Sequence, residues 1–329
     1  MKSLIQKLVE TTGPSGYESQ IRDVIRAEVE PYADDIRVDA LGNLIARKGQ
    51  SGKKIMLAAH MDEIGVIITH IDERGFARFT SLGGVKTKHL PGSRVRFLNG
   101  ASGVIGVERE DDNGGLPALD QMYIDLGAPN REKCPVRLAD VAAFDRPFAD
   151  FGNRLVSKAM DDRIGVAVLI ETLARIKEPA HTLYFVFSVQ EEVGIRGATT
   201  AAFSLDPDFG IAVDVTDTGD TPKGIKMDVG LGKGPAIKVR DAGMLTDPRL
   251  VELMVKTARK SGIPYQLEIL ERGTTDARAI QLTREGVPTG CISIPCRYIH
   301  SPSEMVDYND VENAIHLLVE LLTNPIDIL

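Results

Sequence analysis

Tryptophan is absent from this chain of 329 residues, and aromatic residues make up only 5% of it. Flat sugar faces usually stack on aromatic rings, so the composition argues against a carbohydrate-binding protein. The formal net charge is −8, and no block of lysine and arginine stands out. Nucleic-acid-binding proteins carry basic patches, so we expect no nucleic-acid partner.

Long apolar runs are also missing, so we expect no membrane span. The opening MKSLIQKLVETTGPSG is typical of a short amphipathic helix, and it lacks the apolar core and cleavage site of a signal peptide. Only three cysteines occur, and none forms a CxxC pair. These features predict a cytoplasmic protein whose cysteines stay reduced.

Apolar residues spaced three and four apart predict five further helices. They are Tyr17–Glu30, Arg163–Ile176, Pro248–Lys260, Asp276–Arg284 and Asp310–Leu322. Continuous apolar runs predict strands at Lys54–Ala59, Thr182–Val189, Phe209–Val215 and Gly290–Pro295. Strands that alternate with helices indicate an α/β fold, with a mixed, largely parallel sheet sandwiched by helices.

The middle of the chain has a different pattern. From about residue 67 to residue 156, short alternating segments such as SRVRF and MYIDLGA are separated by turn signals, with no convincing helix among them. This pattern predicts a small β-barrel-like domain. We therefore expect residues 67–156 to be an insertion, and residues 1–66 plus 157–329 to form the α/β domain.

Acidic residues and two of the six histidines follow the predicted strands of the α/β domain. They are His60 and Asp62 after KIMLAA, Glu191 and Glu192 after TLYFVFSVQ, Asp214 at the end of GIAVDV, and His300 after CISIPCRYI. Asp161 and Asp162 open the helix after the insertion. Open α/β sheets bind ligands outside the carboxyl ends of their strands, so these residues predict one shared site.

The residue types indicate a metal site. Histidine with aspartate and glutamate suits Zn²⁺, Co²⁺ or Mn²⁺. His60 and Asp62 are two residues apart and point the same way on an extended chain, so one can bind metal while the other orients it. The adjacent Glu191 and Glu192 point in different directions, which suits one ligand and one general base. Taken alone, Asp161 has the simpler interpretation of a helix N-cap. The coincidence of four strand ends and a helix start favours the metal site.

Five motifs in order, AHMDEIG, SKAMDDRIG, QEEVG, VDVT and RYIHSPSEM, resemble the tetrahedral and glutamyl aminopeptidase family of cocatalytic metallopeptidases. Some members of that family are labelled endoglucanases. The resemblance runs nearly end to end and includes the opening LVETTGPSGYE. It implies a phosphorylase/hydrolase-like α/β domain, an inserted domain that serves dimerisation and assembly, and a homo-oligomer. The oligomer it implies is a tetrahedral dodecamer, with a dimer as the alternative.

The same resemblance implies two divalent metal ions per subunit, Zn²⁺ or Co²⁺ first and Mn²⁺ as a further candidate. His60 and Asp214 would hold one ion, Glu192 and His300 would hold the other, and Asp161 would bridge the two. The substrates would be peptides, cleaved by a water molecule to release their N-terminal residues.

Two further residues receive catalytic roles from the resemblance. Glu191 would be the general base, and Asp62 would orient His60. At Arg278, in TTDARAI, the chain departs from the glycine common in relatives. An arginine beside the substrate would favour an acidic side chain, and the alternative is an arginine that points to solvent.

The competing functions are a deacylase or carboxypeptidase on the same scaffold, an endoglucanase and a non-catalytic metal protein.

Overall fold

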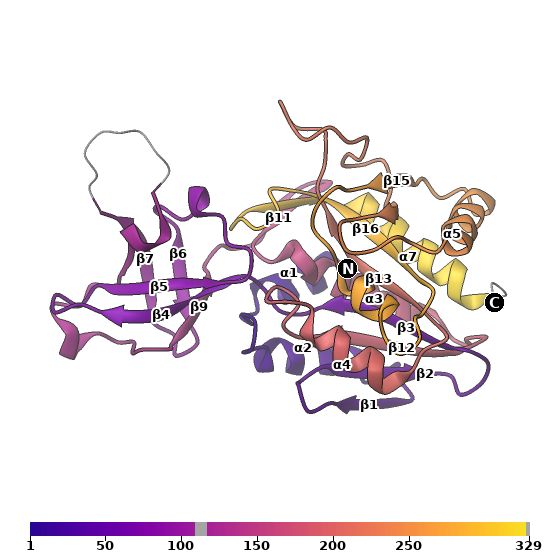
Figure 1. The fold of residues 1–329 in the computed structure, drawn as a ribbon, viewed down its shortest axis with the longest axis horizontal. Coiled ribbons are helices and arrows are strands. Elements are labelled where there is room, and N and C mark those ends of the chain that lie inside the picture. The colour runs from indigo at the N-terminus through magenta and orange to yellow at the C-terminus, as the bar shows by residue number, and fades with distance from the viewer. Residues whose placement is uncertain (109–116, 327–329) are drawn as a thin grey trace.

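The computed structural model describes residues 1–108 and 117–326. Residues 109–116, in the predicted insertion, and residues 327–329, in the predicted α/β domain, lie outside the described residues. The chain forms a large layered α/β body with a smaller barrel beside it (Figure 1).

A mixed sheet of eleven described strands forms the centre of the larger body. Its strands are β1 (Asp35–Val38), β2 (Leu44–Lys48), β3 (Lys54–His60), β10 (Ala149–Phe151), β11 (Arg154–Ser157), β12 (Thr182–Ser188), β13 (Phe209–Thr216), β14 (Ala236–Arg240), β15 (Gln266–Ile269), β16 (Thr289–Arg297) and β17 (Glu304–Asp307). The order is β1–β2–β12–β3–β13–β16–β17–β11–β10, and β14 pairs with both β15 and β16. The four central strands β12, β3, β13 and β16 run parallel, whereas β1, β2, β17, β11 and β10 pair antiparallel.

Helices cover both faces of this sheet. They are α1 (Lys2–Glu10), α2 (Ser19–Val29), α3 (Met160–Arg175), α4 (Arg196–Leu205), α5 (Pro248–Lys260), α6 (Asp276–Gln281) and α7 (Tyr308–Thr323). Strand β3 shows the alternation that a strand imposes on its side chains. Its Leu57 packs in the core shared with α1, α2, α3, α5 and α7, and its Met56 packs in the core shared with α4 and α6.

The smaller body is a closed antiparallel barrel in the order β4–β5–β8–β7–β6–β9. Its strands are β4 (Gly65–Ile71), β5 (Ala77–Leu82), β6 (Arg94–Phe97), β7 (Ser102–Val107), β8 (Met122–Asp125) and β9 (Val141–Phe144). A separate apolar core fills it, with Phe79, Phe97 and Ile124 among its members. Strand β4 begins five residues after β3 ends, so the barrel starts directly beside the predicted site.

The predicted fold class is confirmed: a mixed sheet between helices, with an inserted barrel. The predicted helices and strands are all present, with ends that differ from the prediction by at most three residues. Helix α4 and the strands outside the four central ones were not predicted one by one. These strands are short or partly exposed, so their apolar patterns are weak. Within the described residues, no helix has both the length and the apolar character to cross a membrane.

Candidate metal centre and active site

The carboxyl ends of the parallel strands bring the predicted site residues together. His60 is the last residue of β3, and Asp214 lies near the end of β13. Glu191 and Glu192 follow β12, and His300 follows β16. These strands are neighbours in the parallel part of the sheet, which explains why residues far apart in the sequence meet.

Two groups of potential metal ligands share one carboxylate. His60, Asp161 and Asp214 form the first group, and Asp161, Glu192 and His300 form the second. In each group, one ligand atom from every residue lies within 4.8 Å of the others. Asp161 belongs to both groups, which is the geometry that a bridging ligand requires.

The contacts of Asp161 show how it links the two groups. Its Oδ1 lies 3.0 Å from Nε2 of His60, and its Oδ2 lies 3.3 Å from Nε2 of His300. The same His300 nitrogen lies 3.3 Å from Oε2 of Glu192. Asp161 therefore does not act as a simple helix cap. The hydrogen bond typical of a helix cap is made by Asp162, whose Oδ1 accepts from the Gly165 amide at 3.0 Å.

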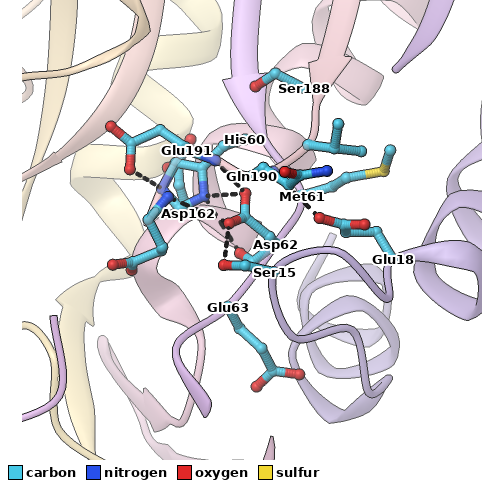
Figure 2. A network of polar contacts seen from close by, with 12 residues as sticks. Ser15, Glu18, His60, Met61, Asp62, Glu63, Asp162, Ser188, Gln190 and Glu191 are labelled. Atoms are coloured by element: carbon cyan, nitrogen blue, oxygen red, sulfur yellow. Dashed lines mark hydrogen bonds and ion pairs between the residues drawn. The ribbon is translucent and has the colours of Figure 1, made fainter. Parts of the chain in front are cut away.

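Asp62 is buried behind His60 and holds the loop that carries the two glutamates (Figure 2). Nδ1 of His60 lies 3.2 Å from the Asp62 carbonyl oxygen and 3.4 Å from its carboxylate. The Asp62 carboxylate accepts hydrogen bonds from the amides of Glu191 and Glu192 at 3.0 and 3.2 Å. Ser15 also donates its hydroxyl to Asp62 at 2.6 Å. One carboxylate thus fixes both the imidazole and the turn after β12.

The electrostatics of the site reflect buried acids close to one another. Burial, together with neighbouring carboxylates, raises the pKa values of Asp214 and Glu191 well above their ordinary values. For His60, burial lowers the pKa, but the hydrogen bonds to Asp161 and Asp62 outweigh it and the net pKa is raised. Such a cluster of buried like charges needs a compensating cation.

Glu304, at the start of β17, was not predicted as a site residue. It is buried, and its two carboxylate oxygens accept hydrogen bonds from the Asp161 amide at 3.0 Å and the His300 amide at 2.8 Å. His300 has a left-handed backbone, with φ of 61°. Glu304 therefore fixes the backbone of the shared residue Asp161 and of His300 in the second group. The sequence signal for it was an acid in the motif HSPSEM that opens the short strand EMVD.

The site opens into a cavity of about 780 Å³. His60, Asp161, Glu191, Glu192, Asp214 and His300 line it, and five lysine and arginine residues also line it: Lys86, Lys88, Lys238, Arg272 and Arg278. Lys86 and Lys88 come from the connection between β5 and β6 of the barrel, so both bodies contribute to the cavity wall.

The residues present fit a pair of divalent metal ions. Both ligand groups combine imidazole nitrogen with carboxylate oxygen, the donor set that suits Zn²⁺, Co²⁺ and Mn²⁺. Oε1 of Glu192 and Oδ2 of Asp162 are buried with no hydrogen-bond partner among the described residues. Buried polar atoms rarely stay unpaired, so the unpaired oxygen of Glu192, an expected ligand, indicates a missing partner.

Comparisons with known proteins agree with this site. The model of the M42 glutamyl aminopeptidase family matches residues 42–317. A putative aminopeptidase of Acetivibrio thermocellus is 48% identical over 324 residues, with 98% of each chain covered. The lysyl aminopeptidase of Pyrococcus furiosus is 39% identical, with 97% of this chain and 96% of the relative covered.

Solved structures match the fold over nearly the whole chain. An aminopeptidase from Desulfurococcus kamchatkensis is 41% identical with a TM-score of 0.94, covering 98% of this chain and 94% of that one. The TET1 peptidase of Pyrococcus horikoshii, which assembles into a tetrahedron or a large octahedral shell, is 33% identical with a TM-score of 0.91, covering 98% and 99%. A Thermotoga maritima protein named as an endoglucanase is 35% identical with a TM-score of 0.82, covering 97% and 96%.

The family match spans most of the chain, and the aminopeptidase relatives cover nearly all of it. The chain therefore belongs to the M42 glutamyl aminopeptidase family and is a peptide hydrolase.

Proposed function

We propose that this protein is a metal-dependent aminopeptidase that removes N-terminal residues from peptides with two divalent metal ions per subunit. The observation that carries the proposal is the pair of ligand groups joined by Asp161, with Glu191 beside them. His60 and Asp214 would hold one ion, and Glu192 and His300 the other. Zn²⁺ and Co²⁺ are the leading candidates, and Mn²⁺ suits the same ligands.

Glu191 fits the role of general base. When bound, the two ions would lower the pKa of a water molecule and polarise the scissile carbonyl. Glu191 lines the cavity, and its Oε2 lies 4.0 Å from Nε2 of His60. Burial raises its pKa, which makes the carboxylate a stronger proton acceptor. In the proposed reaction it removes the proton from the attacking water and then delivers it to the leaving amine.

Asp62 has a positioning role in this scheme. It orients the imidazole of His60 and fixes the backbone of Glu191, so one buried carboxylate sets the position of a ligand relative to the base. The acidic floor of the cavity also suits an exopeptidase, since the free α-amine of a peptide is a cation at neutral pH.

Two other functions compete with this one. A deacylase or carboxypeptidase would cleave substrates whose amine is blocked. An endoglucanase, as the similar Thermotoga maritima protein is named, would need two carboxyl groups about 5–9.5 Å apart on either side of a sugar bond. That function leaves His60, His300 and Asp214 without a role, so the peptidase is the better explanation.

The test is hydrolysis of Leu, Lys, Glu and Asp anilides, each also prepared with an acetylated amine. The protein is first treated with a chelator and then supplied with Zn²⁺, Co²⁺ or Mn²⁺. We expect cleavage of the free-amine substrates only, lost on chelation and restored by metal. Cleavage of the acetylated set would indicate a deacylase, and activity on glucans that survives chelation would indicate an endoglucanase.

We further propose that the inserted barrel, predicted as residues 67–156, serves assembly, while the α/β body, predicted as residues 1–66 and 157–329, carries catalysis. A homo-oligomer is expected because the similar TET1 peptidase forms closed shells. Light scattering after gel filtration distinguishes a dodecamer from a dimer, and a monomer at working concentration would contradict the proposal. The three free cysteines fit a cytoplasmic enzyme.

A further inference from the structure

The barrel reaches the proposed metal site through one turn. After β5, residues Gly83 and Gly84 lie against two of the expected ligands, Glu192 and His300. The Gly84 amide donates a hydrogen bond to Oε2 of Glu192 at 3.3 Å. That oxygen is also the one that lies 3.3 Å from Nε2 of His300.

The fit between the turn and the ligands leaves no room for a side chain. A Cβ added to Gly84 would lie 2.4 Å from Nδ1 of His300 and 2.5 Å from its Cε1. A Cβ added to Gly83 would lie 2.9 Å from both Cβ and Oε2 of Glu192. Real Cβ atoms do not approach other atoms so closely, so the backbone packs directly on the imidazole and the carboxylate.

Two further contacts tie the turn to the same pair of ligands. Nζ of Lys86 donates a hydrogen bond to the carbonyl oxygen of Ile299 at 2.7 Å, directly before His300. Leu82, at the end of β5, pairs with Gly65 at the start of β4. The turn is therefore anchored in the barrel at one end and attached to the His300 segment at the other.

We propose that the Gly83–Gly84 turn of the barrel is a positioning element for Glu192 and His300, and that one of the two metal sites is complete only when the barrel packs against the α/β body. The other ligand group, His60 with Asp214, is held from within the α/β body by Asp62 and by β13. The turn thus acts on one ion and not on the other. The inference rests on the proposed metal pair.

Gly84→Ala is the sharpest test. The glycine has no left-handed backbone angle, so alanine adds a steric conflict with His300 rather than backbone strain. Partners that orient metal ligands typically change metal affinity by about 10–100-fold when removed. We expect Zn²⁺ titration of the chelated full-length protein to show one ion bound about 10–100-fold more weakly and the other unchanged.

A matched control lies in the same connection. Gly92 has a left-handed backbone, with φ of 77°, and no atom within 4 Å of an added Cβ. Gly92→Ala should lower thermal stability but keep both ions bound as in the wild type. If Gly84→Ala does not fold, Lys86→Met removes the link to Ile299 and should weaken the same ion by a few-fold.

The outcomes are separable. Wild-type protein that binds no pair of ions overturns the proposed function itself. Wild-type protein that binds two ions, with a folded Gly84→Ala variant that binds both equally well, overturns the role of the turn alone. An equal loss of both ions in Gly84→Ala also contradicts it, because the turn contacts one ligand group only. Should only Lys86→Met fold, unchanged binding of both ions in that variant overturns the role of the turn.

Discussion

The two bodies of this protein bury very different side chains. Among the described residues of the barrel, from Gly65 to Phe144, Ser93 is the only polar or charged residue that is buried. The α/β body buries many, including Asp62, Asp162, Arg163 and Lys238. The barrel has an ordinary apolar core, whereas the larger body places charges where water cannot reach them.

This difference separates the parts of the molecule that stabilise it from the parts that act. Burying a charge costs free energy unless partners compensate, so a fold retains such charges where they have a use. Some of them are paired, as Lys158 is with Glu63 at 2.7 Å. Others, such as Asp162 and Glu192, keep an oxygen without a partner among the described residues. Glu192 follows β12 at the carboxyl ends of the parallel strands, and Asp162 lies in the first turn of α3 next to Asp161, so both are beside the proposed metal pair.

The largest predicted effect tests the proposed general base, which lies in the α/β body. Glu191→Gln keeps the shape of the side chain but removes its ability to take a proton. We expect kcat to fall by about 10²–10⁴-fold, with both metal ions still bound. Steady-state hydrolysis of an aminoacyl-anilide, together with metal analysis, measures both quantities.

The control for this variant lies in the barrel. Glu132 is exposed, and Glu132→Gln makes the same chemical change away from the site. It should leave kcat unchanged. Retained activity in Glu191→Gln would remove Glu191 from the mechanism and leave the function of the site to another residue.

The next effect concerns Glu304. In Glu304→Gln, one of the two backbone amides of Asp161 and His300 faces an amide NH₂ group in place of an oxygen. Misplaced ligands should weaken metal binding by about 10–100-fold. Zn²⁺ titration measures the affinity, and circular dichroism checks the fold. Wild-type affinity for both ions would show that other contacts suffice to place these ligands.

Much of the site was predictable because strand ends are readable in the sequence. The structure brings together five residues that lie at the end of an apolar strand, follow one or open a helix: His60, Asp161, Glu192, Asp214 and His300. Their metal-binding and catalytic roles remain predictions.

The positioning contacts were not predictable in the same way. Glu304 and Gly84 act through backbone amides across the fold, and neither has a local pattern that states its partner. Likewise, the antiparallel edges of the sheet depend on pairing between distant segments, such as β10 and β11 with β17.

A smaller effect is expected in stability, at Asp276. This carboxyl is buried, one of its oxygens has no partner among the described residues, and burial raises its pKa to about 6 from an ordinary 3.8. Because the folded-state pKa is raised, the ionised group costs stability; this cost begins above pH 3.8 and is complete above pH 6. Asp276→Asn can still accept the hydrogen bond from Ser188.

We therefore expect Asp276→Asn to stabilise the protein more at pH 8 than at pH 5, by about 1 kcal/mol. Urea unfolding of the variant and the wild type at both pH values measures the difference. Asp120→Asn, at an exposed position of the barrel region, should show no such dependence. A gain in stability that is equal at the two pH values would mean that ionisation of Asp276 is not its source.

The smallest predicted effect is at Arg278, and it tests whether the positive charge around the cavity selects the substrate. Arg278 is exposed on α6, its side chain has no hydrogen bond or ion pair within the described residues, and it lines the cavity together with Lys86, Lys88 and Arg272. This basic rim around an acidic floor should attract a substrate whose first side chain is a carboxylate. An exposed ion pair is worth about 0.2–1 kcal/mol, so Arg278→Ala should lower kcat/KM for the Glu anilide by up to about five-fold relative to the Leu anilide. The change should fall mainly on KM and shrink at high salt, since screening weakens exposed pairs.

Arg146→Ala removes the same charge from an exposed position outside the cavity lining and should leave the ratio unchanged. An equal loss for both substrates would mean that Arg278 supports α6 and does not select the substrate, and no change would mean that its guanidinium faces solvent throughout the reaction.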